Sequence, residues 1–277
     1  MEPKRPAEIL DYTRDLGILK TQRSISVVLI LSFLAGAYIA FAAQGSNMAA
    51  HNLLANYELY GLGRVLKGAV FGAGLMLVVF AGGELFTGNI LIIVGVMDRK
   101  VTIGKMLTNW LLVYIGNMLG ALCIAWMMYH SGLFNSSGGL LGAVTIRSAA
   151  YKTALDFFPA FILGVLCNWL VCLAMWVAYG ARDTVGKILL IFFVICLFAT
   201  SGFEHSIANM YYIPAGILAA QNPQWLSMAQ LTAEQISGLN WANYFIVNLL
   251  PVTLGNIFGG AALVGIPYWF ALGNKKQ

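Results

Sequence analysis

Charged residues are scarce in this chain of 277 residues, because Asp, Glu, Lys and Arg together make up only 10% of it. A soluble domain averages about 25% charged residues, so the composition excludes an ordinary soluble globular protein. The net charge of +5 is not gathered into a basic groove with interleaved aromatic residues. We therefore expect no nucleic-acid partner.

Residues that bind metals or act as nucleophiles are also few. The chain has four cysteines and three histidines, without a Cys-x-x-Cys pair or the Cys/His spacing of a zinc site. All four cysteines lie within apolar segments, where small buried side chains are expected. No nucleophile is paired with a base in the sequence, as an enzyme would need. We expect no metal, no cofactor, no disulfide framework and no enzymatic activity.

Long apolar runs, in contrast, are abundant. Hydrophobic residues make up 60% of the chain, and a membrane-spanning helix needs roughly 20 predominantly apolar residues. Six such runs occur, at about residues 25–43, 68–97, 106–129, 157–181, 188–219 and 243–272. The sequence predicts an all-α polytopic membrane protein with six transmembrane helices, in which residues 1–277 form a single domain.

The basic residues predict the orientation in the membrane. If both termini are cytoplasmic, twelve lysines and arginines lie on the cytoplasmic side and four on the outer side, namely Arg64, Lys67, Arg147 and Lys152. This distribution follows the positive-inside rule. We expect a multi-pass protein of the inner (cytoplasmic) membrane with both termini in the cytoplasm.

Two of the apolar runs contain the same polar interruption, Gly-x-Glu-x-x-x-small-Asn. It occupies residues 82–89 in the second run and residues 202–209 in the fifth. Carboxylates and amides are costly to bury in hydrocarbon, and non-helical backbone at membrane depth must line a cavity or be covered by protein. We therefore expect helices 2 and 5 to be broken, with a solute path between two related halves.

A second repeated pattern supports a duplication. The spacing N-x6-G-N-x-x-G begins at Asn109 in the third run and at Asn248 in the sixth, and a weaker F-x-x-G echo links residues 33–36 with 161–164. We interpret the glycines as helix-packing positions and Asn117 and Asn256 as bonds between helices. An odd number of helices per half requires opposite insertion of the second half. The prediction is two inverted three-helix repeats, residues 25–129 and 157–272, with an amphipathic cytoplasmic segment 1–24, a connecting segment 130–156 and a cytoplasmic tail 273–277.

The two acids of the interruptions each precede the second half of a broken helix. There a carboxylate can accept bonds from free backbone N–H groups and meets the positive end of the helix dipole. Holding the breaks in shape is their expected role, and a direct role in transport is the alternative. The residues expected to form the scaffold of the breaks are Gly82, Glu84, Asn89, Gly202 and Asn209.

Three other polar residues have two readings each. His205 is either a neutral histidine bonded to a backbone carbonyl or a pore residue, and its unperturbed pKa near ~6.5 would let it exchange a proton. The hydroxyl of Thr87 either satisfies its own backbone or faces the solute. Lys152 stands four residues before Asp156, so the residues alone favour an i,i+4 ion pair.

Three segments carry a resemblance to a known family: LFTG at residues 85–88, NWLVCLAMW at 168–176 and GFEHSIANM at 202–210. Together they resemble the formate/nitrite transporter family, and the likeness runs over essentially the full chain. The resemblance implies an aquaporin-like fold of six helices, with helices 2 and 5 broken, assembled as a homopentamer. Each protomer would contain its own pore for a small monovalent anion.

The resemblance also implies roles for residues. It places His205 at the pore centre with Thr87 close by, and Lys152 in an outer vestibule. The residues expected to attract the anion are Lys152, Asn168 and Glu204, and those expected to form apolar constrictions are Phe71, Leu75, Phe86, Val171 and Phe198. The expected function is transport of a weak-acid anion that is protonated near His205, with formate as the first candidate. Nitrite, hydrosulfide or lactate transport by the same pore is the alternative, and a structural membrane protein without transport is a remote one.

Overall fold

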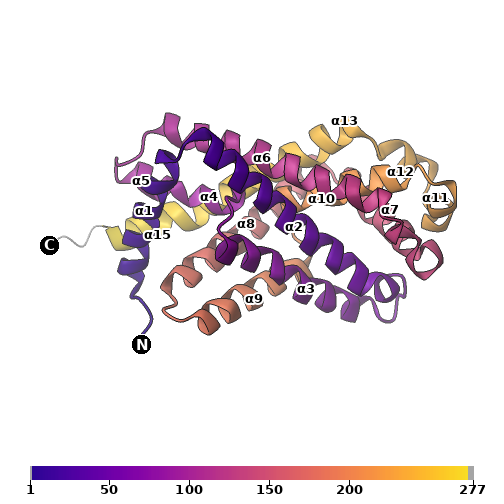
Figure 1. The fold of residues 1–277 in the computed structure, drawn as a ribbon, viewed down its shortest axis with the longest axis horizontal. Coiled ribbons are helices and arrows are strands. Elements are labelled where there is room, and N and C mark those ends of the chain that lie inside the picture. Colours follow the sequence, from indigo (N-terminus) through magenta and orange to yellow (C-terminus); the bar gives the residue numbers. More distant parts are fainter. Residues whose placement is uncertain (1, 274–277) are drawn as a thin grey trace.

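Six long apolar helices dominate the structure. The computed structural model describes residues 2–273, which form helices and connecting turns without a strand. The helices long and apolar enough to cross a membrane are α2 (Ile25–Leu54), α3 (Tyr60–Ala81), α6 (Ile103–His130), α8 (Phe157–Gly180), α9 (Thr184–Ser201) and the composite segment Trp241–Gly273. The shortest has 18 residues and is about 27 Å long, close to the hydrocarbon thickness of a bilayer. The predicted all-α polytopic fold is confirmed (Figure 1).

Shorter helices complete the chain. They are α1 (Pro6–Gln22), α4 (Phe86–Asn89), η1 (Ile90–Ile92), α5 (Ile93–Met97), η2 (Leu133–Gly139), α7 (Leu140–Thr153), α10 (Ser206–Ala219), α11 (Pro223–Ala229) and α12 (Ala233–Gly238). The composite last span consists of α13 (Trp241–Asn243), η3 (Tyr244–Leu249), α14 (Leu250–Gly260), η4 (Ala261–Gly265) and α15 (Ile266–Gly273). The segment expected to be a connection, residues 130–156, thus contains η2 and α7. Residues 274–277 of the predicted tail lie outside the described residues.

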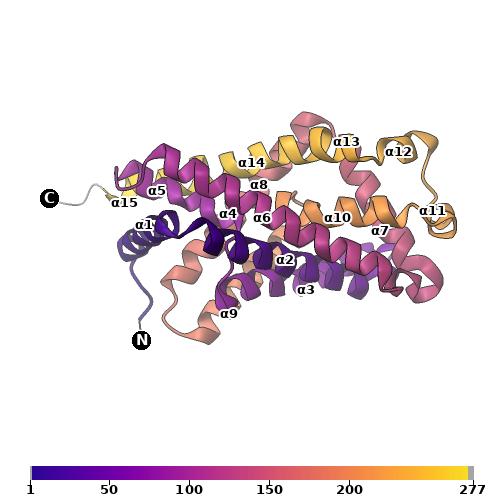
Figure 2. The same ribbon diagram turned by 45° about the horizontal axis from the view of Figure 1, so that its top comes forward.

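Glycines let the long helices pack closely. α2 packs along α6 and α3, and α8 packs along α14 and α9. A Cβ added to Gly120 would lie 2.9 Å from the backbone nitrogen of Ala37, and one added to Gly259 would lie 3.1 Å from that of Trp169. These distances leave no room for a side chain, so the two glycines are packing positions, as the sequence predicts. Figure 2 shows the resulting elongated bundle.

Both polar interruptions stop a helix. α3 ends at Ala81 and α9 ends at Ser201, and each is followed by a glycine in the left-handed conformation, Gly82 with φ of 87° and Gly202 with φ of 85°. Glycine adopts this conformation without a Cβ clash, which is why it commonly ends helices. After residues 82–85 the chain starts α4, and after residues 202–205 it starts α10.

The N-terminal helix α1 packs on the bundle. Its residues Ile9, Leu10 and Thr13 are buried, and it contacts α5, α8 and α15 at one end of the molecule (Figure 1). Asp98 directly follows α5. It forms an ion pair with Arg14 of α1 at 3.6 Å and accepts a hydrogen bond from the indole N–H of Trp269 of α15. The predicted amphipathic segment is therefore tied to the protein by packing and polar contacts, beyond the membrane-surface anchoring expected for it.

Candidate functional site

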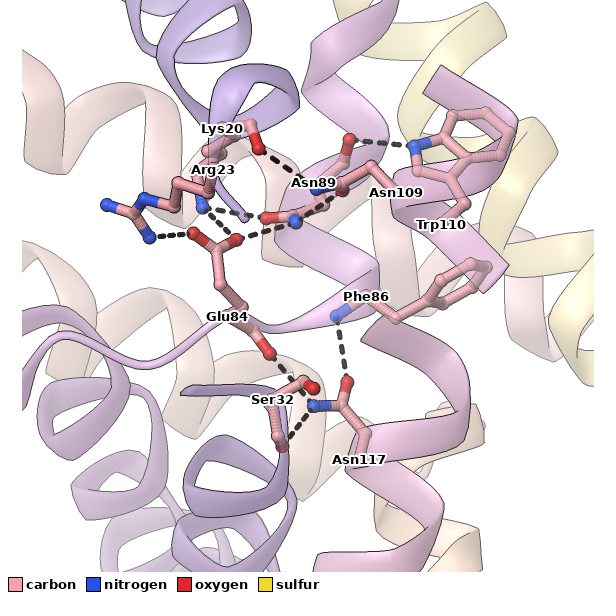
Figure 3. A network of polar contacts seen from close by, with 9 residues as sticks. All are labelled: Lys20, Arg23, Ser32, Glu84, Phe86, Asn89, Asn109, Trp110 and Asn117. Atoms are coloured by element: carbon pink, nitrogen blue, oxygen red, sulfur yellow. Dashed lines mark hydrogen bonds and ion pairs between the residues drawn. The ribbon is translucent and has the colours of Figure 1, made fainter. Parts of the chain in front are cut away.

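A buried carboxylate lies at the centre of the first helix break. Glu84 is fully buried and accepts hydrogen bonds from Lys20 Nζ at 2.7 Å and Asn89 Nδ2 at 2.7 Å, and it forms an ion pair with Arg23. Burial lowers the pKa of Lys20 from its ordinary value, and the attraction of Glu84 opposes that shift. A buried charge is costly unless it is paired and hydrogen-bonded, and this carboxylate is both (Figure 3).

The second break has a similar arrangement, with one cation paired to its carboxylate among residues 2–273 where the first break has two. Glu204, 2% exposed, accepts hydrogen bonds from Lys152 Nζ at 2.7 Å and from Asn209 Nδ2 at 2.7 Å. The lysine comes from α7 here and from α1 in the first break. Lys152 therefore pairs with the acid of the break, and the i,i+4 pair with Asp156 that the residues alone favour is wrong.

The asparagines of the breaks extend both networks. Asn89 donates to Asn109 Oδ1 at 2.9 Å, and Asn209 donates to Asn248 Oδ1 at 2.7 Å. Asn109 and Asn248 in turn donate to the backbone carbonyls of the two lysines, at 3.3 and 2.9 Å. Each lysine is thus held through its ammonium group and its backbone. The scaffold role expected for the asparagines agrees with these contacts.

Asn117 of α6 satisfies the free backbone groups of the first break. Its Oδ1 accepts the N–H of Phe86 at 2.9 Å, and its Nδ2 donates to the carbonyls of Ser32 at 2.7 Å and Glu84 at 2.8 Å. One amide side chain therefore connects α2, α6 and the non-helical segment. Such bonds are needed because no water is available in hydrocarbon to satisfy exposed backbone groups.

Asn256 of α14 does the same at the second break. Its Oδ1 accepts the N–H of Ser206 at 2.9 Å, and its Nδ2 donates to the carbonyls of Gly164 at 2.8 Å and Glu204 at 3.0 Å. The interpretation of both asparagines as bonds between helices is confirmed. Their second function, fixing the shape of the breaks, was not evident from the sequence.

The matched contacts also correct the register of the predicted repeat. Ser32 and Gly164 present their carbonyls to equivalent asparagines, and these positions are 132 residues apart. The predicted echo between residues 33–36 and 161–164 assumes 128 residues, so it is wrong by about one helical turn. When the two halves are aligned at the corrected offset, Lys20 corresponds to Lys152. This is the sequence signal that would have found Lys20, which sequence reasoning missed.

Thr87 and His205 join the two breaks. Thr87 Oγ1 lies 2.9 Å from His205 Nε2, and His205 Nδ1 accepts the backbone N–H of Ala208 at 3.1 Å. Because Nδ1 is an acceptor, the proton of the neutral ring is on Nε2 and is donated to the threonine hydroxyl. Thr87 therefore does not use its hydroxyl on its own backbone, and the ring of His205 has no hydrogen bond to a carbonyl within residues 2–273.

A cavity of about 820 Å³ leads to this pair from the α7 end of the bundle. Its lining includes Lys152, Glu204 and His205 and the rings of Phe71 and Phe198. The two phenylalanine rings meet edge to face at 5.6 Å, and the ring of Phe198 is 6.0 Å from that of His205. An apolar pair of rings thus stands beside the histidine in the lining of the cavity.

The other three residues predicted to form constrictions do not line the cavity. Leu75 and Val171 are buried and do not line the cavity. The ring of Phe86 packs against Trp110, at 6.2 Å between ring centroids (Figure 3), and against Tyr114 at 4.9 Å. These contacts do not test the constriction roles expected for the three residues, which stay predictions.

Asn168 of α8 reaches the region of Thr87. Its Nδ2 donates to the carbonyl of Asn256 at 2.7 Å and to the carbonyl of Thr87 at 3.3 Å, while its Oδ1 has no partner among residues 2–273. The residue therefore lies beside the Thr87–His205 pair. Within residues 2–273 no group of three His, Cys, Asp or Glu side chains is arranged to hold a metal ion.

Six apolar helices, two interrupted helical segments with paired buried charges and a cation-lined cavity define a polytopic membrane protein with a buried polar site. The family model described as Formate/nitrite transporter matches residues 7–270, and the chain belongs to this family. The resemblance noted in the three sequence segments is confirmed over nearly the whole chain.

Named relatives and solved structures agree with this assignment. A probable formate transporter of Methanothermobacter thermautotrophicus is 37% identical over 96% of both chains. The formate channel FocA of Escherichia coli (strain K12) is 35% identical over 95% of this chain and 93% of FocA. A solved pentameric formate channel with formate bound has a TM-score of 0.79 and 34% identity, covering 89% of this chain and 97% of the other.

Proposed function

We propose that the protein conducts a small monovalent weak-acid anion, with formate as the first candidate, through a pore within each protomer. The Thr87–His205 hydrogen bond at the end of the cation-lined cavity is the observation that carries the proposal. A hydroxyl and an imidazole next to apolar rings offer hydrogen bonds to a carboxylate as it gains a proton and leaves water. The formate relatives support formate over nitrite, hydrosulfide or lactate.

The solute enters from the α7 end, where the cavity is wide. Lysines and arginines along its wall attract the anion and raise its local concentration. At the inner end the anion meets the rings of Phe71 and Phe198, which an unpaired charge crosses only at high cost. Protonation removes that cost, because a neutral acid needs far less solvation than its anion.

The hydrogen bonds at the centre support a donor role for Thr87. His205 donates through Nε2 to Thr87, so the hydroxyl proton of Thr87 is free to be donated to a carboxylate oxygen. The solute takes its proton from water in the cavity while these groups hydrogen-bond to it, crosses as the neutral acid and returns the proton to water on the far side. Asn168 is close enough to Thr87 to orient the same solute. Leu75, Phe86 and Val171 are proposed to keep the rest of the path dry.

The path continues to the α1 end through the first break. The gap there, beside Lys20 and Gly88, has a volume of about 10 Å³, which is barely enough for one water molecule. The arrangement is thus wide at the α7 end and narrow at the α1 end. The matched networks of Glu84 and Glu204 support an inverted repeat in which each half supplies one break.

Orientation and assembly belong to the same proposal. The positive-inside rule puts the α1 end in the cytoplasm and the α7 end outside the inner membrane. Large apolar side chains such as Leu111 and Phe193, 61% and 66% exposed in the single chain, then face lipid or neighbouring protomers. The pentameric formate channel of similar fold supports a homopentamer.

Flux measurements in liposomes test the proposal. We expect the purified protein to carry formate faster than nitrite, lactate or hydrosulfide, with a rate that depends on pH. His205→Asn should abolish that pH dependence, whereas His130→Asn, an exposed histidine at the end of α6, should leave it unchanged. Lys152→Ala should lower the rate at low formate concentration.

Two results would count against the proposal. Full pH-independent electrogenic flux through the His205→Asn protein would remove the histidine from the mechanism. Absence of flux for all four solutes with the unmodified protein would favour the remote alternative, a structural membrane protein.

A further inference from the structure

The cavity at the α7 end holds more positive charge than its acid can neutralise. Four cationic side chains line it, Arg64, Lys67, Arg147 and Lys152, and Glu204 is the one acidic residue among the described residues that does. The basic residues of the lining therefore outnumber the acidic one by three. A concave site with excess charge of one sign concentrates counter-ions of the other sign.

Two of these cations are largely engaged by the protein itself. Lys152 donates to the carboxylate of Glu204 at 2.7 Å. The guanidinium of Arg64 donates to the carbonyls of Ala199 and Thr200 at the end of α9, at 2.9 to 3.1 Å. Their hydrogen bonds serve the second break and the end of a helix, so part of their capacity to donate to a solute is already used.

Arg147 and Lys67 differ from this pair. Arg147 makes one bond, from Nη2 to the carbonyl of Met228 at 3.2 Å, and its Nε has no partner within residues 2–273. The ammonium of Lys67 has no hydrogen bond and no ion pair with any of residues 2–273. It stands over the ring of Tyr212, 4.5 Å from the centroid, and Lys152 is 5.4 Å from the same centroid.

We propose that Lys67 forms a carboxylate-binding site in this cavity and receives the solute before it reaches Lys152 and His205. An ammonium group has three donors, and a carboxylate oxygen bound by a charged donor makes one of the stronger hydrogen bonds in proteins. The buried ring of Tyr212 fixes the position of Lys67 and contacts Lys152 as well, so a solute bound at Lys67 is close to the next cation along the path.

The chemical class that fits is a small monocarboxylate or a monovalent oxyanion of similar size. The cavity volume of about 820 Å³ is far larger than such a solute, so the anion keeps part of its hydration shell while bound. The site at Lys67 therefore discriminates between solutes by their charge. The apolar rings beyond it discriminate between them by size. This inference rests on the proposed transport function for its place on the path.

The first test measures transport by the full chain in liposomes at low ionic strength. Lys67→Met should raise the formate concentration at half-maximal flux by about tenfold, as expected for a lost charge-assisted hydrogen bond, with little change in the maximal rate. Lys67→Arg should restore the half-maximal formate concentration of the unmodified protein. Lys105→Met makes the same charge change on the exposed surface of α6 and should have no effect. A half-maximal concentration for Lys67→Met within twofold of the unmodified protein would overturn the proposal.

The second test measures occupancy without transport. The protein in lipid nanodiscs is treated with a small amine-acylating reagent, and mass spectrometry measures labelling at Lys67 and Lys105. Millimolar formate should protect Lys67 severalfold and leave Lys105 unprotected, while chloride at equal ionic strength protects neither. Equal labelling of Lys67 with and without formate would refute the site even if flux is normal. Protection without any flux would instead keep the site and refute the proposed transport.

Discussion

Asn256 makes the sharpest test of how a helix is broken inside this protein. Its amide side chain satisfies three backbone groups of the second break, the N–H of Ser206 and the carbonyls of Gly164 and Glu204. All four residues are buried. Asn256→Ala removes the three bonds without adding bulk, and the groups left behind have no water to replace the side chain.

The magnitude follows from the number of bonds. Interhelical hydrogen bonds in membrane proteins average about 0.6 kcal/mol each, which sets a lower limit of about 2 kcal/mol for three. An unsatisfied buried backbone group costs about 1–3 kcal/mol, which raises the expected loss. We expect Asn256→Ala to lower the free energy of unfolding by about 3 kcal/mol.

The assay is reversible unfolding in lipid bicelles or mixed micelles. Asn117→Ala should lower the free energy of unfolding by the same amount as Asn256→Ala, within about 1 kcal/mol, because Asn117 makes the same three kinds of hydrogen bond at the first break. Asn135→Ala is the matched control, since Asn135 is exposed and makes one local bond. A loss below about 1 kcal/mol for Asn256→Ala would refute the idea that this amide holds the break.

Three further outcomes are expected. Glu84→Gln should lower the free energy of unfolding by about 3 kcal/mol, because it leaves the buried ammonium group of Lys20 without its carboxylate, and Lys20→Met should lower it by less, because Glu84 keeps its ion pair with Arg23. The double variant should lose less than the sum of the two losses; additive losses would show that the pair is not coupled. Gly164→Ala should lower the free energy of unfolding by about 1–3 kcal/mol, because the added Cβ would lie 2.7 Å from a carbonyl oxygen of α14. Gly104→Ala is the control in the same assay. Its added Cβ would have nothing within 4 Å, so the change should be neutral or stabilising. Phe198→Ala should raise water permeability of proteoliposomes in stopped-flow light scattering, and an unchanged permeability would exclude its ring from the constriction.

Local chemistry explains what could be predicted from the sequence. Apolar runs of about 20 residues are read directly as spans, because hydrocarbon accepts little else. The breaks were predictable for the same reason: Gly82 and Gly202 stop a helix, and an acid two residues later has no place in an uninterrupted apolar span. The duplicated asparagine and glycine pattern was visible because identical residues recur at identical spacing.

The register of the first and fourth helices was not predictable from single residues. Gly36 and Gly164 are both close-packing positions, and glycines are frequent enough in membrane helices for a chance match one turn out of register. The hydrogen bonds from Asn117 and Asn256 settle which carbonyls are equivalent. Only with that alignment does Lys20 become the counterpart of Lys152.

The sequence by itself determined the membrane class, the six spans, the two interruptions and the residue types that would be costly to bury there. Tertiary structure alone decided the partners of those residues. Thr87 and His205 are 118 residues apart and meet at 2.9 Å, and the ammonium groups that pair with Glu84 and Glu204 arrive from α1 and α7. Hydropathy and helix-ending signals act over a few neighbouring residues, whereas the partner of a buried charge is set by how distant helices pack.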